Sequence, residues 1–494
     1  MHRIAGYDML DSDDRIQRFD CYIKELAGVI GRSDRAVPLR DYCIGLLSLD
    51  KRKNAERIAE RICPEGTSAK HQQMQHFVSD SPWRDADLLA KVREIVMPQF
   101  ERRGGVEAVV IDDTSFPKKG HDSAGAARQY CGQLGKQENC QTAVTLSFVS
   151  HELSLPVAVS LYLLQETVDD MAHRRKTHIP ETTEFRTKPE IALAQLRDLS
   201  EKKNLPSRVV LMDAGYGAST KLRNDLTEMD LTYVAGIHPQ TSVWVERTAV
   251  SNSLSVRKRK STKTNPFRFQ VRKLARKLPE DAWENIEWRQ GACAPLSSRF
   301  ARVRIRPAHR NRKSMKEEWL LIEWPKSEPE PTKYWFSTLP EGISFSSLVD
   351  NAKLRWRIER DYQELKQEVG AGDYQVRGWR GFHHHAALSI AAYAFLVCER
   401  ERVPPEDRVP ACHSRNLTFP RVFDVNKPPV RTARHVPNSI ATMRAAIALA
   451  LAELLLLRPR NPAPIDTQSQ RPFQAPLTEL SKTVIQRNNV QRNL

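Results

Sequence analysis

The chain has few cysteines, and their spacing follows no known site. Eight cysteines occur in 494 residues, and no two of them form a Cys-x-x-Cys pair. This pattern argues against both a disulfide framework and a zinc ribbon, and it is typical of a protein in a reducing cytosol.

Long apolar runs are also absent. The first 24 residues are charged throughout and lack the apolar core of about 7 to 15 residues that a signal peptide needs. The most apolar stretch, Ala445–Leu457, is too short to span a bilayer and contains Glu453, which indicates a buried helix. We therefore expect a cytoplasmic, nucleoid-associated protein without a membrane segment.

Acidic residues are outnumbered by basic ones. The chain carries 77 Lys and Arg against 60 Asp and Glu, a net charge of +17. Such an excess favours a polyanionic partner, because each neutralised phosphate releases condensed counterions. At roughly 150 residues per domain, the length predicts about three folding units.

The order of predicted elements indicates an α/β protein. Apolar residues at helical spacing from Arg15 to Gln99 predict an N-terminal helical, DNA-binding domain over residues 1–100. Residues 101–238 then read strand, strand, strand, helix, strand, helix, strand, the order of an RNase-H-like mixed sheet. The predicted strands are Val106–Asp112, Thr142–Val149, Leu155–Leu163, Arg208–Met212 and Thr232–Gly236, and the predicted helices are Pro189–Lys203 and Ser219–Leu226.

The rest of the chain divides by composition. Residues 239–340 form a basic, tryptophan-rich segment that we interpret as a largely β insertion in the catalytic core. Within it, 257–277 is either a DNA-tracking arm or a solvated loop. Residues 341–400 complete the core, and 401–494 form a proline-rich linker, a helix capped by Asn438 or Ser439 and a tail.

Two acids follow apolar runs and are candidates for catalysis. Asp112 follows Val109–Ile111, and Asp213 follows Val209–Met212 and precedes Gly215 and Gly217. Phosphodiester transfer with two metal ions needs carboxylates from separate segments, and acids at strand ends can supply them. Each acid taken alone also fits a helix cap or a turn.

A third acid lies in a charged segment with helical spacing. Arg355, Glu359 and Lys366 stand at positions i, i+4 and i+11, which is one stripe of a helix. A carboxylate between two cations suits a metal ligand bordered by phosphate clamps. An ordinary surface helix with ion pairs has the same spacing.

These residues occur in a known signature. Arg355, Glu359 and Lys366 fill three of the four positions in Tyr, two residues, Arg, three residues, Glu, six residues, Lys, while Ala352 stands at the Tyr position. The chain thereby resembles the DDE transposases of bacterial insertion sequences, most nearly the insertion-sequence family seven-hundred-one. Further similar segments are Asp112–Gly120, Arg128–Gly132, Gly135–Gln141, Gly370–Gly372 and Gly378–His385.

The resemblance implies an activity and a set of site residues. Asp112, Asp213 and Glu359 would be the catalytic and metal-binding triad, holding two Mg2+ ions for which Mn2+ can substitute. Arg355 and Lys366 would touch DNA near the cut, and Trp356 would stack on a displaced base. We further predict DNA contacts for Arg357, Lys118 and Lys119.

The implied function is cut-and-paste transposition. Water hydrolyses the phosphodiester at each insertion-sequence end, and the freed 3' hydroxyl attacks target DNA, with a DNA-hairpin intermediate implied by the family. The expected partners are double-stranded DNA, both terminal inverted repeats and target, and a second copy of the chain in a homodimer on DNA. The alternatives are a transposase-derived DNA-binding regulator and a nuclease without strand transfer.

Several other residues compete for these roles or invite a different interpretation. Asp113 is the rival of Asp112, and Glu364 is a weaker rival of Glu359. The run His383–His385 suggests a metal site, but successive helical residues diverge by about 100 degrees, so we predict packing or a phosphate contact instead. No glycine-rich loop for ATP phosphates occurs.

Overall fold

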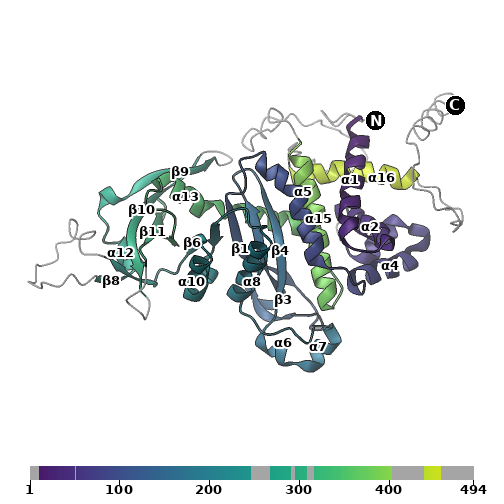
Figure 1. Ribbon diagram of the computed structural model, residues 1–494, viewed down its shortest axis with the longest axis horizontal. Helices are drawn as coiled ribbons and strands as arrows, with labels where there is room; N and C mark the ends of the chain where they lie inside the picture. Colours follow the sequence, from purple (N-terminus) through teal and green to yellow (C-terminus); the bar gives the residue numbers. More distant parts are fainter. Residues whose placement is uncertain are drawn as a thin grey trace, which may run out of the picture. The chain divides into compact units, whose positions relative to one another are not determined.

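The computed structural model describes residues 10–50, 52–245, 267–290, 295–308, 316–402 and 439–457 (Figure 1). Helices of four or more residues are α1 (Leu10–Val29), α2 (Ala36–Leu47), α3 (Ala55–Ile62), α4 (Thr67–Ser79), α5 (Asp85–Glu101), α6 (Gln165–Asp169), α7 (Met171–Thr177), α8 (Lys188–Glu201), α9 (Ala214–Gly217), α10 (Thr220–Glu228), α12 (Val271–Ala275), α13 (Phe345–Leu354), α14 (Arg357–Gln367), α15 (Trp379–Arg400) and α16 (Ile440–Leu457). The strands are β1 (Ala108–Pro117), β2 (Ala127–Cys131), β3 (Lys136–Val149), β4 (Ser154–Tyr162), β5 (Val209–Met212), β6 (Thr232–Gly236), β7 (Ser242–Val245), β8 (Phe267–Gln270), β9 (Glu284–Gln290), β10 (Pro295–Pro307), β11 (Glu318–Trp324) and β12 (Lys333–Ser337).

One mixed sheet of 12 strands organises the chain. Its order is β2-β3-β1-β5-β6-β12-β11-β10-β7-β8, with β4 also paired to β3 and β9 to β10. Strands β1, β5 and β6 are parallel, and β3 is antiparallel to β1. The predicted α/β class is therefore confirmed. The five strands predicted over residues 101–238 occur in the predicted order, but β2 lies between the first two of them and was not predicted.

The β-rich insertion continues this sheet. Strand β12 pairs with β6 through Ser337 and Val234, so the inserted strands extend the sheet that carries β1 and β5. One hydrophobic core includes Val110 and Leu211 from the central strands together with Trp319 and Trp335 from the insertion. Of the predicted basic segment 257–277, residues 257–266 lie outside the described part of the chain.

Helices cover both faces of the sheet. On one face, α8 is bonded to the sheet through its Gln195 side chain, which donates to the Val144 carbonyl and the Ser160 hydroxyl of the β3–β4 hairpin. On the other face, Leu348 of α13 and Ile358 of α14 complete the hydrophobic core.

The N-terminal helices pack around α15 (Figure 1). This helix is apolar around most of its circumference, as expected for a helix that is buried on all sides. Phe19 of α1 meets its Phe395 edge-on, and the Tyr22 hydroxyl donates to the Ala391 carbonyl at 2.7 Å. The predicted N-terminal helices are confirmed, while the boundary at residue 100 stays a prediction.

By its internal contacts the chain forms two units, Met1–Ala452 and Glu453–Leu494. Ser439 caps α16 by accepting a hydrogen bond from the Thr442 amide at 3.2 Å, one of the two predicted caps. The predicted proline-rich linker at 403–438 and the tail after Leu457 lie outside the described residues. Within the described part, the cysteines are free thiols.

Two element predictions were wrong. Strand β1 does not end at Asp112 but continues to Pro117, because residues 113–117 keep pairing with β3 after β5 has ended. The segment that contains Arg355 and Glu359 is not one helix. The Trp356 and Glu359 amides donate to carbonyls three residues earlier, and these tighter 3₁₀-type bonds separate α13 from α14.

The glycines after Asp213 serve close packing and not an unusual backbone angle. Gly217 has no positive φ, but a Cβ there would collide with the Gly236 carbonyl at the end of β6. Helix α9 therefore lies directly against the strand next to β5. Only a residue without a side chain permits this approach.

We expect Gly217→Ala to destabilise the protein by about 1 to 3 kcal/mol, because the backbone of β6 must move to admit the methyl group. Thermal unfolding would show this as a lower Tm. Gly342→Ala is the matched control, since a Cβ at Gly342 meets no atom within 4 Å. Equal melting temperatures for the two variants would contradict the packing described.

Candidate active site

The fold brings Asp112 and Asp213 together. Strands β1 and β5 are paired in parallel up to Ile111 and Met212, so the next residue of each strand is one of the two acids. Neighbouring strands lie about 4.8 Å apart. The Asp213 carboxylate also caps α9 by accepting a hydrogen bond from the Tyr216 amide at 3.1 Å.

Asp112 is buried and held by two hydrogen bonds. Its residue surface is 8% exposed. The Arg355 Nη2 donates to Asp112 Oδ2 at 2.7 Å, and the Asp113 amide donates to Oδ1 at 2.8 Å. Burial raises the pKa of Asp112 to about 7, and nearby Asp213 acts in the same direction, while Arg355 lowers it.

Arg355 connects all three candidate acids. Its Nη1 lies 3.8 Å from Glu359 Oε1, so one guanidinium contacts Asp112 and Glu359 through different nitrogens. Burial lowers the pKa of Arg355, but Asp112, Asp213 and Glu359 together raise it above its ordinary value. The three acids therefore share one electrostatic environment.

The donor set fits a divalent cation. In the described residues, no three His, Cys, Asp or Glu side chains lie close enough to hold a metal ion as they stand. Asp112 and Asp213 nevertheless form a pair of carboxylates on adjacent strands, and Mg2+ prefers such oxygen ligands. The Glu359 side chain is 71% exposed and lies across the Arg355 guanidinium from Asp112.

The rival acids are engaged elsewhere. Asp113 points to the opposite face of the sheet from Asp112 and accepts from Lys188 Nζ of α8 at 2.9 Å. Glu364 is buried and accepts from Arg360 Nε at 2.6 Å and from the Tyr393 hydroxyl at 2.8 Å.

Two lysines predicted to contact DNA are bonded to the protein backbone. The Lys366 Nζ donates to the Ser115 carbonyl of β1, and Lys118 Nζ donates to the Tyr374 carbonyl, each at 2.9 Å. Burial lowers the pKa of both lysines, that of Lys118 to about 8. Lys119, in contrast, is exposed.

Arg357 and Trp356 pack on each other beside the acids. The Arg357 guanidinium lies over the Trp356 ring at 5.2 Å and donates to the Glu152 carbonyl at 2.6 Å. Trp356 is half-buried in the turn between α13 and α14.

Two tyrosines at the site were not predicted from the sequence. The buried Tyr362 hydroxyl bonds the Thr145 hydroxyl beside Asp112. The Tyr216 hydroxyl is buried and has no hydrogen-bond partner within the described residues. Burial raises the pKa of Tyr216, and Asp113, Asp112 and Asp213 raise it further. Tyr216 follows Asp213 by three residues, and Tyr362 follows Glu359 by three residues. This spacing was the signal in the sequence that could have identified both tyrosines.

The histidines at the start of α15 serve packing, one of the two roles predicted for them. His383 Nδ1 lies 3.0 Å from the Trp379 carbonyl, and His385 Nδ1 lies 2.8 Å from the Tyr42 hydroxyl. The His384 ring stacks on Trp83 at 3.5 Å between centroids. Their rings therefore contact three different parts of the protein.

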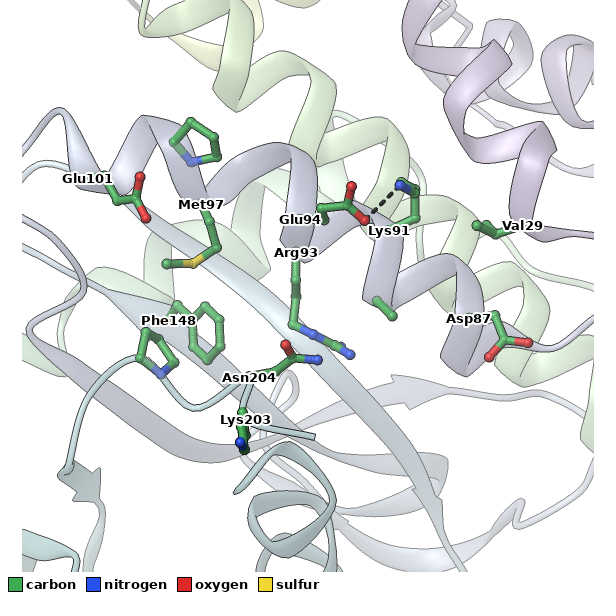
Figure 2. A pocket seen from close by; sticks show the side chains of 13 residues that line it. Val29, Asp87, Lys91, Arg93, Glu94, Met97, Glu101, Phe148, Lys203 and Asn204 are labelled. Atoms are coloured by element: carbon green, nitrogen blue, oxygen red, sulfur yellow. Dashed lines mark hydrogen bonds and ion pairs between the residues drawn. The ribbon is translucent and has the colours of Figure 1, made fainter. Parts of the chain in front are cut away.

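The groove along α5 is a separate place from these acids (Figure 2). It has a volume of about 780 Å³, and Arg93 and Asn204 point into it from opposite sides. Both acidic and basic side chains line it. Two of its cations are already bonded, since Lys91 pairs with Glu94 at 2.7 Å and Arg93 donates to the Val157 carbonyl. Asp112, Asp213 and Glu359 do not line it.

Comparison with known proteins points to a nucleic-acid enzyme. A family model described as "DDE superfamily endonuclease" matches residues 25–295, a range that contains Asp112 and Asp213 but not Glu359. A protein of Microchaete diplosiphon, described as "Probable transposase for insertion sequence element IS701", is 25% identical over 361 residues, 72% of this chain and 79% of that protein. None of the described helices is long and apolar enough to cross a membrane.

The raised pKa of Asp112 predicts a dependence of stability on pH. Its folded pKa of about 7 lies above the roughly 3.9 of an unfolded Asp, so the folded state binds more protons between these values. The contribution to stability is full below about pH 4 and is lost as the pH rises to about 7. Asp112→Asn removes this titration.

In a metal-chelating buffer, the stability of Asp112→Asn relative to the wild type should therefore rise by roughly 2 kcal/mol from pH 5 to pH 8. Thermal unfolding at both pH values measures the difference. A difference that stays constant with pH would show that Asp112 ionises normally.

Proposed function

Because this chain belongs to the DDE superfamily of endonucleases, we propose that it is the DNA transposase of an insertion sequence. It cuts at the ends of the element and joins the 3' hydroxyl ends to target DNA by Mg2+-dependent phosphodiester transfer. The observation that carries the proposal is the position of Asp112 and Asp213, which directly follow the paired residues of two adjacent parallel strands. Arg355 donates to Asp112, and both acids raise the pKa of Arg355.

The catalytic core is RNase-H-like. Strands β4, β3, β1, β5 and β6 stand side by side in this order, with β1, β5 and β6 parallel. Along the chain, β1, β3 and β4 precede α8, β5, α10 and β6, with β2, α6, α7 and α9 as short additional elements, and this order supports the same assignment. The insertion between β6 and α13 separates the first two acids from Glu359.

Asp112, Asp213 and Glu359 are the ligands for two Mg2+ ions, which Mn2+ can replace. When bound, the ions stabilise the attacking and leaving oxygens of the phosphodiester. The contacts support Asp112 over Asp113, which pairs with Lys188, and Glu359 over the buried Glu364. Arg355 neutralises Asp112 in the absence of other cations.

The predicted DNA contacts differ in accessibility. Lys119 is exposed and meets DNA directly, and the half-buried Trp356 stacks on a displaced base. Arg355 donates to Asp112, so it meets DNA only by exchanging that bond. Lys366, Lys118 and Arg357 each donate to a backbone carbonyl, so they reach DNA only by exchanging that bond for a phosphate. Two subunits act together on the paired ends as a homodimer on DNA.

We expect Glu359→Ala to reduce cleavage of end DNA by more than about a thousandfold while leaving end binding unchanged, because the variant loses a metal ligand and no DNA contact. Cleavage gels and binding isotherms measure the two effects. Glu228→Ala, at an exposed acid of α10, is the matched control. Full cleavage by Glu359→Ala would remove this residue from the triad.

A pre-cut end offered together with target DNA separates a transposase from a nuclease that does not join strands. The transposase joins the 3' hydroxyl to the target, whereas a nuclease or a DNA-binding regulator leaves both DNAs unjoined. Without joined product from the wild type, strand transfer must be withdrawn from the proposal.

Added Mg2+ should raise the Tm of the wild type and of Asp113→Asn, but not that of Asp112→Asn. A ligand at about 100 times its Kd stabilises the folded state by about 2.7 kcal/mol. Thermal unfolding with and without Mg2+ measures the shift. The reverse pattern, with the shift lost only in Asp113→Asn, would make Asp113 the ligand.

A further inference from the structure

Strands β2 and β3 form a hairpin with exposed side chains at its free end. We call residues 127–140 the 127–140 hairpin. It reverses direction at Gly132–Gly135, where Gly135 has φ +65° and donates to the Cys131 carbonyl. Tyr130 and Leu134 are 58% and 45% exposed, which is unusual for large hydrophobic side chains.

The strand register places this end of the hairpin on the face of Asp112. Asp112 pairs with Thr145 on β3, and Tyr130 pairs with Gln137 on the same strand. These two β3 residues are separated by an even number of positions, so Asp112, Thr145, Gln137 and Tyr130 share one face of the sheet. At roughly 3.4 Å per residue, Tyr130 lies at most about 27 Å along the strand from Asp112.

The accessible cations beside this face lie on or next to the hairpin. Arg128, which pairs with Asn139, is exposed and forms no ion pair within the described residues. Asn139 Nδ2 donates to the Lys118 and Gly120 carbonyls at 2.8 and 3.0 Å, which fixes the exposed Lys119 beside the hairpin.

The other cations of this region are less available. Lys136 is exposed but pairs with Glu138 at 3.1 Å. Lys118 and Lys366 are half-buried and donate to backbone carbonyls. Among the described residues on or next to the hairpin, Arg128 and Lys119 can therefore meet a phosphate without breaking a hydrogen bond or an ion pair to a side chain.

We propose that the 127–140 hairpin contacts the DNA duplex about eight base pairs from the phosphodiester that is cut, since duplex DNA rises 3.4 Å per base pair. A two-stranded β ribbon fits the major groove. Arg128 and Lys119 bind backbone phosphates, and Tyr130 contacts a base or sugar. This inference rests on the proposed function, because it takes end DNA as the ligand.

Binding to a nested set of end duplexes tests the hairpin. The double variant Arg128→Ala/Tyr130→Ala should bind duplexes that extend twelve or more base pairs from the cut about tenfold more weakly, with a salt dependence reduced by about one phosphate. Duplexes that end about five base pairs from the cut should bind as they do to the wild type. Lys202→Ala, at the exposed lysine that directly follows α8, is the control.

Both substituted side chains are exposed, so the Tm of the double variant should equal that of the wild type. An equal loss of affinity for short and long duplexes would overturn the proposal, and so would no loss for either. Failure of the proposed function looks different, because the wild type would then neither cut nor join end DNA.

Crosslinking locates the contact directly. With p-benzoylphenylalanine at position 130, irradiation should crosslink a nucleotide about six to ten base pairs from the cut. The same group at position 202 should not crosslink DNA. A crosslink from position 130 to a second copy of the chain, or to DNA at the cut itself, would assign the hairpin another role.

Discussion

The ion pair between Arg355 and Asp112 is the interaction on which the site depends. A buried carboxylate next to a second carboxylate is costly unless it takes up a proton, and a partner charge stabilises its ionised form. Arg355, which lies 243 positions from Asp112 in the chain, provides that charge. The pair therefore joins the strand that begins the core to the helices that complete it.

The same ion pair lies at the break between two helices. Arg355 reaches Asp112 from the turn between α13 and α14, where 3₁₀-type hydrogen bonds replace the α-helical ones. Directly after the turn, Ile358 enters the hydrophobic core and Glu359 faces solvent beside the guanidinium. Charge and packing thus set the orientation of α14 together.

Much of the core was predictable because apolar runs mark buried strands. Val109–Ile111 and Val209–Met212 are such runs, and the acids after them meet because their strands are parallel neighbours. The end of β1 was not predictable, since Asp113–Pro117 is polar and contains proline, yet it pairs with β3. No glycine or proline marks the break at Arg355, so the local sequence carries no signal for it.

Composition alone also could not place the insertion or the lysines. The change in composition after His238 suggested a separate subdomain, but the pairing of β12 with β6 joins its strands to the central sheet. Lys118 and Lys366 look like surface charges in the sequence, and only the tertiary fold brings them, half-buried, to backbone carbonyls. Glu359 was predicted from its motif, because the helical spacing alone also fits an ordinary surface helix.

The number of residues in the short turn between α13 and α14 sets how α14 is rotated relative to β1. Adding or deleting one residue there would rotate α14 by about 100 degrees relative to β1. Ile358 would leave the core, and Lys366 would leave the Ser115 carbonyl. Relatives of this protein can therefore exchange side chains within the turn more readily than they can alter its number of residues.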